Sequence, residues 1–143
     1  MAPEDGESMN LKEVRTFLQR EFPQSDIKVE QLGGQGARVR LQVGFAHLRP
    51  GGTVSGPSLM TTADCALYVA ILAELGPVKL AVTTSLTINF LRRPSADCDV
   101  IGQCRLMKIG KRLVVGEVYL YSEGHKDAVA HVIGTYSIPP QNK

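Results

Sequence analysis

Residues 55–76 read SGPSLMTTADCALYVAILAELG, and this stretch decides the fold. Ser55 is a suitable N-cap, and Pro57 fits the first turn of a helix, where a missing N–H costs little. Gly76 suits the position just after the last turn, and the proline behind it prevents continuation. The pattern therefore predicts a helix over residues 56–75. Because this helix is apolar on nearly every side, we expect other parts of the fold to enclose it.

Asp64 is the one charged residue between Arg49 and Glu74. A carboxylate inside an apolar helix is costly unless it is paired, hydrogen-bonded or protonated. Aspartate is also a poor residue for a helix interior. Asp64 is therefore a candidate for chemistry. The alternative is a structural acid paired with Arg49 or with a backbone amide.

The composition is that of a soluble, globular, single-domain protein of 143 residues. A net charge of +2 gives no argument for nucleic acid, and the acid within the long helix argues against a membrane span. Cys65, Cys98 and Cys104 lack metal-ligand spacing, so we expect reduced thiols, a cytoplasmic location and no metal. Cys65 is expected to be a small core residue. Residues 1–8 are polar and acidic, which predicts a disordered tail before a single domain at 9–143.

The remaining pattern predicts an α+β fold. Asn10 is the expected N-cap of a short N-terminal helix that ends near Glu21. Alternating or apolar runs predict strands over residues 27–32, 37–43, 82–91, 99–108, 114–121 and 128–138, with a loop at 44–56. The economical arrangement is one curved antiparallel sheet of about six strands that wraps the long helix, with a partner subunit closing the open side. The small residues Gly102 and Gly116 suit a close approach between helix and sheet.

The entry to the long helix resembles that of hotdog-fold acyl-CoA thioesterases of the phenylacetic-acid-degradation type. That family carries Asn-x-x-Gly-x-x-His-Gly-Gly, followed by an apolar run to Leu-Ala-Asp-x-Ala. In this chain the matching positions are Gly52, Gly56, Ala63, Asp64 and Ala66, whereas Arg49, Ser55 and Pro57 replace the Asn, the His and the second Gly. The strand LTINFLRRP at 86–94 and the turn at Gly110-Lys111-Arg112 also match.

The resemblance implies hydrolysis of a thioester of CoA or of an acyl carrier by a homodimer, with a homotetramer as the expected full assembly. It implies that Asp64 is the general base or the nucleophile and that the Gly56 N–H polarises the carbonyl. It also implies that Thr83 of the partner subunit positions the water. No cofactor is expected apart from CoA as part of the substrate.

The substrate contacts are expected at two sets of residues. Arg49, Ser55 and Asn89 would orient the substrate, and the charge of Arg49 is expected to pair with Asp64. The phosphates of CoA would meet basic residues at strand ends and a turn, namely Arg92, Arg93, Lys108, Lys111 and Arg112. These charges could instead be ordinary surface residues. The replacements at Arg49, Ser55 and Pro57 also favour two alternatives: an acyl-CoA binder or sensor without turnover, and a structural assembly partner.

Overall fold

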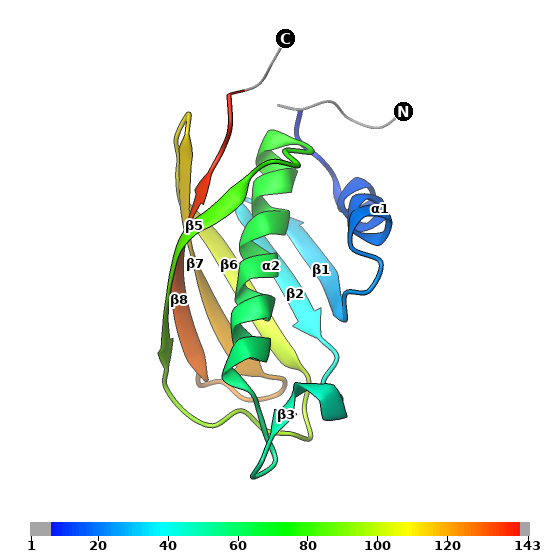
Figure 1. Cartoon of the computed structure of the whole chain (residues 1–143), viewed down its shortest axis with the longest axis vertical. Coiled ribbons are helices and arrows are strands. Elements are labelled where there is room, and N and C mark those ends of the chain that lie inside the picture. The colour runs from blue at the N-terminus through cyan, green and yellow to red at the C-terminus, as the bar shows by residue number, and fades with distance from the viewer. Residues whose placement is uncertain (1–6, 141–143) are drawn as a thin grey trace.

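The computed structural model describes residues 7–140, and it has the hotdog architecture that the sequence predicts (Figure 1). The central helix α2, Gly56–Leu75, lies against the concave face of one antiparallel sheet. The strand order in this sheet is β1-β2-β6-β7-β8-β5. The strands are β1 Ile27–Gly33, β2 Gly36–Leu41, β5 Val82–Phe90, β6 Val100–Ile109, β7 Leu113–Ser122 and β8 Ala130–Ser137. Of the tail predicted at 1–8, residues 1–6 lie outside the described part.

Helix α2 begins and ends where its sequence predicts. The Ser55 Oγ accepts a hydrogen bond from the backbone N–H of Ser58 at 3.2 Å, which caps the first turn. The backbone N–H of Gly76 donates to the carbonyl of Leu72 at the other end. By length and composition α2 could cross a membrane, but half of it is buried within the protein, so it is the core helix. Its fully buried side chains include Leu59, Leu67, Ile71 and Leu72.

Glycines on β7 and β8 allow the sheet to pack closely on α2. A Cβ atom at Gly134 would lie 2.4 Å from Leu67 Cδ1, and one at Gly116 would lie 2.7 Å from Leu67 Cδ2. A larger residue at either position would force the buried Leu67 side chain to shift, at a cost in packing. The prediction that Gly116 marks a close approach is therefore confirmed.

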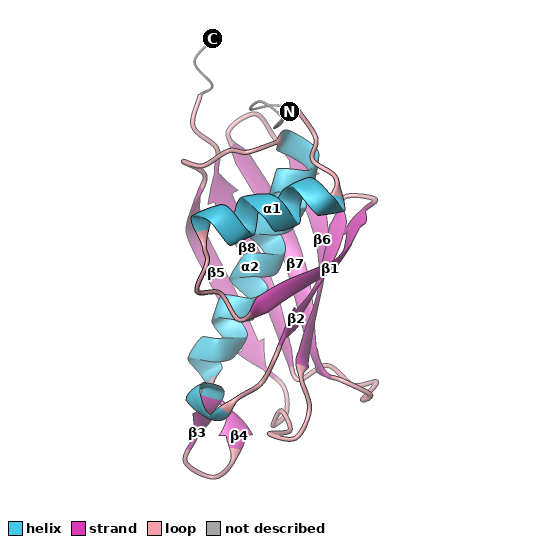
Figure 2. Cartoon of the chain, turned by 90° about the vertical axis from the view of Figure 1, so that its right-hand side faces the viewer, coloured by secondary structure: helices cyan, strands magenta, loops and turns pink. Residues whose placement is uncertain are grey.

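The short N-terminal helix α1, Leu11–Glu21, packs across β1 and α2 (Figure 2). Asn10 and Glu13 form a reciprocal capping box, as the sequence predicts. The buried side chains of Val14 and Phe17 fix this helix on the core.

The segment predicted as a loop at 44–56 has more structure than expected. It forms a short 3-10 helix at Phe45–His47 and a two-stranded hairpin of β3, Leu48–Arg49, and β4, Thr53–Val54. Gly51 and Gly52 have φ values of 101° and 75°, which is the conformation that glycine allows at a tight turn. Strands of two residues are too short to leave an alternating pattern in the sequence, which explains the difference.

A β-bulge in β5 breaks the alternation predicted for residues 82–91. Thr83 lies opposite Tyr136 and Ser85 lies opposite Thr135, which leaves Thr84 as the extra residue. The even-numbered residues Leu86 and Ile88 still face the core. Before the bulge the phase is reversed, so Thr83 faces α2 and Val82 is 57% exposed, whereas unbroken alternation would place Val82 on the same face as Leu86.

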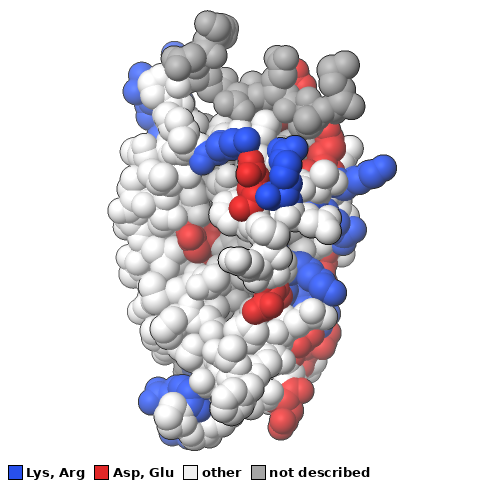
Figure 3. Space-filling view, turned by 45° about the vertical axis from the view of Figure 1, so that its right-hand side comes forward, with Lys and Arg blue, Asp and Glu red and all other residues white. Residues whose placement is uncertain are grey.

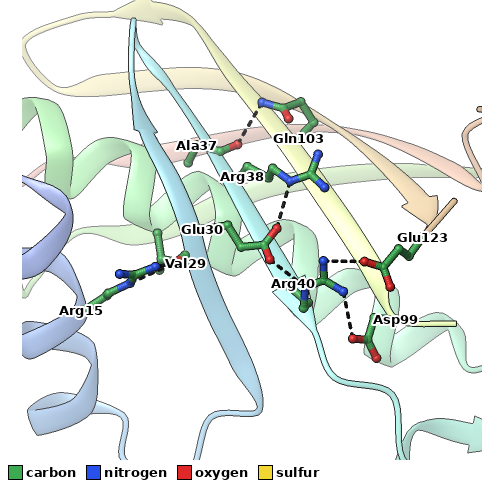
Figure 4. A network of polar contacts seen from close by, with 9 residues as sticks. All are labelled: Arg15, Val29, Glu30, Ala37, Arg38, Arg40, Asp99, Gln103 and Glu123. Carbon is green, nitrogen blue, oxygen red and sulfur yellow. Dashed lines mark hydrogen bonds and ion pairs between the residues drawn. The ribbon is translucent and has the colours of Figure 1, made fainter.

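A network of ion pairs joins β1 and β2 to the residues just before β6 and just after β7, which lie side by side (Figure 4). The Arg40 guanidinium contacts Glu30, Asp99 and Glu123 at 2.7, 3.0 and 2.6 Å. The hydrogen bonds from Arg40 and then Arg38 hold the pKa of Glu30 below its usual value, and Arg40 does the same to the pKa of Glu123.

This network predicts how stability depends on pH. Because the folded-state pKa values of Glu30 and Glu123 lie below the unfolded value of 4.5, the unfolded chain binds more protons in acid. We therefore expect the contribution of this network to the free energy of unfolding to be complete above about pH 4.5. This contribution should fall as the pH drops through the folded-state pKa values of the two glutamates. In an Arg40→Met variant, urea unfolding between pH 7 and pH 3 should show a smaller acid-dependent loss. An unchanged pH dependence would contradict this role of the network.

Candidate functional site

The carboxylate of Asp64 is held by two hydroxyl groups of the same chain. The Thr83 Oγ1 and the Tyr136 hydroxyl each donate a hydrogen bond of 2.7 Å to Asp64 Oδ1. The Tyr136 hydroxyl also lies 3.2 Å from the Asp64 carbonyl oxygen. Both side-chain hydrogen bonds use Oδ1, so neither occupies Oδ2. These two hydrogen bonds fix the direction of the side chain, and Asp64 lines a neighbouring cavity.

The fold explains why these three side chains meet. Thr83 and Tyr136 are directly opposite each other in the β5–β8 register, so their hydroxyls lie side by side. The bulge in β5 turns Thr83 toward α2, which is a known way of re-aiming a side chain beside a functional site. The sequence predicted that Thr83 of the partner subunit positions the water, whereas the structure shows Thr83 in contact with Asp64 of its own chain.

Tyr136 was not singled out by the sequence. It is 4% exposed, and burial is the main cause that raises the pKa of its hydroxyl, so this group stays protonated at physiological pH and can donate a hydrogen bond. A sequence signal did exist, since Tyr136 shares the core-facing side of its strand with Val132 and Gly134. A tyrosine at such a position needs a partner for its hydroxyl, and the one nearby acid of the core helix was the available candidate.

Gly56 lies at the first turn of α2, where backbone N–H groups have no partner within the helix. It precedes Asp64 by eight residues, which corresponds to roughly 12 Å along the helix axis. Gly56 and Asp64 of one chain therefore cannot act on the same carbonyl group. A cavity of about 550 Å³ opens beside Gly56 and is lined by Arg49, Arg92 and Arg93 among others.

The other predicted basic residues lie near the opposite end of β5 from Arg92 and Arg93. Leu113 and Val82 both face Ser137 in the register, which places Lys111 and Arg112 near the start of β5. Arg92 follows the end of this nine-residue strand, so the two basic groups are separated by roughly 30 Å. The guanidinium of Arg92 also donates to the carbonyl of Ala128. Lys108 is exposed near the same end as Arg112.

The remaining predicted residues have separate surroundings. Arg49 is exposed, and among residues 7–140 no ion pair joins it to Asp64, so the expected pairing is not made within one chain. Ser55 caps α2, as described above. Asn89 lies opposite His131 on the convex face, because its neighbour Ile88 faces the core. Cys65 lines the Asp64 cavity, and burial raises the pKa of its thiol to about 12, which makes it a neutral wall rather than a nucleophile.

Metal chemistry has no evident site in this part of the chain. Within residues 7–140 no group of three His, Cys, Asp or Glu side chains is placed to hold a metal ion. The carboxylate that Thr83 and Tyr136 hold lies beside an open cavity of about 720 Å³. Such a group can accept a proton from water or attack a carbonyl carbon.

The fold and the acid on its central helix define a hotdog protein with a candidate hydrolytic site. A family model described as Thioesterase superfamily matches residues 51–129, which is more than half of the chain. The chain therefore belongs to the thioesterase superfamily. A search of curated proteins finds no match.

Solved structures agree with this assignment. The chain is 41% identical to a candidate thioesterase from Silicibacter sp. TM1040, with a TM-score of 0.86 and coverage of 96% of this chain and 97% of that one. It is 27% identical to a mutant form of the phenylacetic acid degradation protein PaaI from Thermus thermophilus, with a TM-score of 0.71 over 87% of this chain and 99% of that one. Zebra fish thioesterase superfamily member 2 shares the fold at 19% identity, with a TM-score of 0.82 over 92% and 100% of the two chains.

Proposed function

We propose that this protein is a cytoplasmic hydrolase of acyl thioesters, with CoA or an acyl carrier as the thiol component. The observation that carries this proposal is the Asp64 carboxylate, which Thr83 and Tyr136 hold at the edge of a largely apolar cavity. Release of free thiol from a panel of acyl-CoA esters, followed with a thiol reagent, tests the proposal. A protein that releases no thiol from any member of the panel would contradict it.

The reaction needs water and the carboxylate, and CoA enters only as part of the substrate. As a general base, Asp64 would take a proton from water while the oxygen of that water bonds to the thioester carbon. The carbon–sulfur bond then breaks, and the proton passes to the departing thiolate. As a nucleophile, Asp64 would instead form a mixed anhydride that water hydrolyses. Both routes place negative charge on the carbonyl oxygen, which requires a hydrogen-bond donor.

In a dimer that pairs through β5, this donor would be the backbone N–H of the partner's Gly56. β5 is an edge strand of nine residues, and the hydrophobic side chains at its two ends, Val82 and Phe90, are 57% and 55% exposed. A long exposed edge is a template for pairing with another strand. Met60 on the open side of α2 is also 40% exposed. Figure 3 shows that the left part of this face is mostly uncharged around one acidic group, whereas other charged side chains gather in the upper centre, along the right and at the lower left.

The symmetry of that pairing completes the site. A two-fold axis near Leu86, in the middle of β5, would reverse the strand and bring the Thr83 end of one copy beside the Phe90 end of the other. Phe90 packs on Gly56, since a Cβ there would lie 3.2 Å from the Phe90 ring. The partner's Gly56 would therefore lie beside Asp64 of this chain. The resulting homodimer contains two equivalent sites, and two dimers could associate into a homotetramer.

The same pairing would gather the basic residues. It brings the partner's Arg49, Arg92 and Arg93 toward the start of β5 in this chain. The basic residues near that end of the sheet are Lys108, Lys111 and Arg112. Arginine and lysine at such a boundary suit the phosphate groups of CoA. A non-catalytic acyl-CoA sensor remains the second candidate, because Arg49 and Ser55 replace family residues that orient the substrate. Tight binding of an acyl-CoA without thiol release would favour the sensor.

The hydroxyl of Tyr136 is expected to act as a positioning group. Tyr136→Phe keeps the ring but removes one of two hydrogen bonds to a charged oxygen, which is worth about 1.5–3 kcal/mol. We expect kcat to fall roughly 10- to 100-fold with little change in KM.

Thr83→Val is the matched variant for the other donor and should produce a similar fall. A merely structural role would change the melting temperature and leave kcat of the folded fraction intact. That result in both variants would contradict the positioning role.

A further inference from the structure

The cavity beside Asp64 extends away from the subunit boundary toward α1. Its wall is formed by the end of α1 at Leu18 and Phe22, by the following segment to Ile27, by one side of α2 at Tyr68, and by the start of β5. Its volume is about 720 Å³, within the range of small-molecule sites. Because Asp64, Thr83 and Tyr136 also line it, one space joins the fixed carboxylate to the underside of α1.

Aromatic rings form the far wall of this cavity. Tyr68 lies one helical turn beyond Asp64, roughly 6 Å along the same face of α2. The Tyr68 ring is nearly parallel to Tyr136 at 6.1 Å and meets Phe22 edge-on at 5.9 Å between ring centroids. The ring of Phe22 is half exposed, so part of it is available to cover a ligand. A wall of aromatic rings therefore leads from the carboxylate toward α1.

The charged groups of the cavity argue against an anionic ligand tail. Apart from Asp64, they are Glu21 and Lys79, which form an ion pair of 2.7 Å at the rim. The hydrogen bond from Lys79 is the main cause that lowers the pKa of Glu21, which keeps the pair charged at neutral pH. Lys79 is thus already paired, and a second carboxylate in the cavity would meet two acids and one engaged cation.

We propose that this α1 cavity binds the acyl group of the substrate and selects neutral, apolar acyl groups of medium length. The proposal rests on the proposed thioester hydrolysis, since Asp64 marks where the thioester carbonyl lies. The acyl chain would run from Asp64 along Tyr68 and end under Phe22. Each methylene group buried there is worth about fourfold in binding. Acetyl groups would leave the cavity unfilled, and a terminal carboxylate would lose its hydration without gaining a partner.

Three substrates of matched design test this selectivity: acetyl-CoA, octanoyl-CoA and suberoyl-CoA, the last being the octanoyl chain with a terminal carboxylate. We expect kcat/KM for octanoyl-CoA to exceed that for acetyl-CoA by about 100-fold or more. It should exceed that for suberoyl-CoA by at least roughly tenfold. Phe22→Ala should lower kcat/KM for octanoyl-CoA about tenfold and leave that for acetyl-CoA within about twofold. Phe45→Ala is the control, since Phe45 is 92% exposed and lies outside the cavity lining.

The outcomes separate this proposal from the proposed function. Thiol release that ignores chain length, or that changes equally for acetyl-CoA and octanoyl-CoA in Phe22→Ala, would overturn the acyl cavity while hydrolysis stands. If no ester is hydrolysed, calorimetric titration of the Asp64→Asn variant with the same esters still measures whether the cavity selects among acyl groups. A preference for octanoyl-CoA that Phe22→Ala removes would support the cavity, and equal dissociation constants for all three esters would overturn it.

Discussion

Replacing Asp64 with asparagine is expected to lower kcat for thioester hydrolysis by about 10²- to 10⁴-fold, the usual contribution of a general base. Asparagine has the same shape, and its carbonyl oxygen can still accept hydrogen bonds from Thr83 and Tyr136. It can neither take the proton of water nor attack a carbonyl carbon. Activity should therefore disappear while the circular dichroism spectrum and the dimer remain those of the wild type.

The control for this experiment is Asp26→Asn, which makes the same chemical change at an exposed ion pair with His47. Its kcat should equal that of the wild type, because surface ion pairs contribute little and Asp26 lies outside the Asp64 cavity. An Asp64→Asn protein that hydrolyses esters at the wild-type rate would refute the assigned role of the carboxylate. Loss of activity in both variants would point to a general effect of the substitutions.

The architecture could be predicted because its signals are local and periodic. Ser55, Pro57 and Gly76 mark the ends of α2, and the absence of a polar face predicts that the sheet encloses it. Gly116 indicates where the sheet approaches closely, as the contact with Leu67 confirms. Asp64 stood out for the opposite reason, since a lone carboxylate violates the pattern around it.

The partners of Asp64 were harder to predict because each depends on a non-local feature. Thr83 appears on the wrong face when strict alternation is assumed, and the bulge at Thr84 that reverses it is recognised only from the register with β8. Tyr136 lies 72 residues from Asp64 in the sequence, so only the fold brings them together. The expected pairing of Arg49 with Asp64 is not made within one chain for a related reason. Arg49 sits on the hairpin at the start of α2, two helical turns from the acid.

The boundary between subunits gives the second large expected effect. Ser85 and Thr87 are exposed on β5, on either side of Leu86, and they point away from α2. In the proposed two-fold pairing Ser85 lies opposite the partner's Thr87. The double change Ser85→Asp and Thr87→Asp would place like charges directly across the boundary, which is destabilising. We expect this variant to be monomeric by analytical ultracentrifugation and to lose thiol release, although Asp64, Thr83 and Tyr136 all remain in each chain.

Hydrolysis requires both a carboxylate and an oxyanion donor at the same carbonyl group, and one chain cannot supply both. Asp64 with its two donors is complete within a single copy, but Gly56 lies too far along the helix to reach the same carbonyl. A folded monomer should therefore bind acyl groups weakly and hydrolyse none. Gln31→Asp on β1, the strand at the opposite edge of the sheet, supplies the matched control and should remain dimeric and active. An active monomer would show that the oxyanion donor comes from the same chain and that the shared site is wrong.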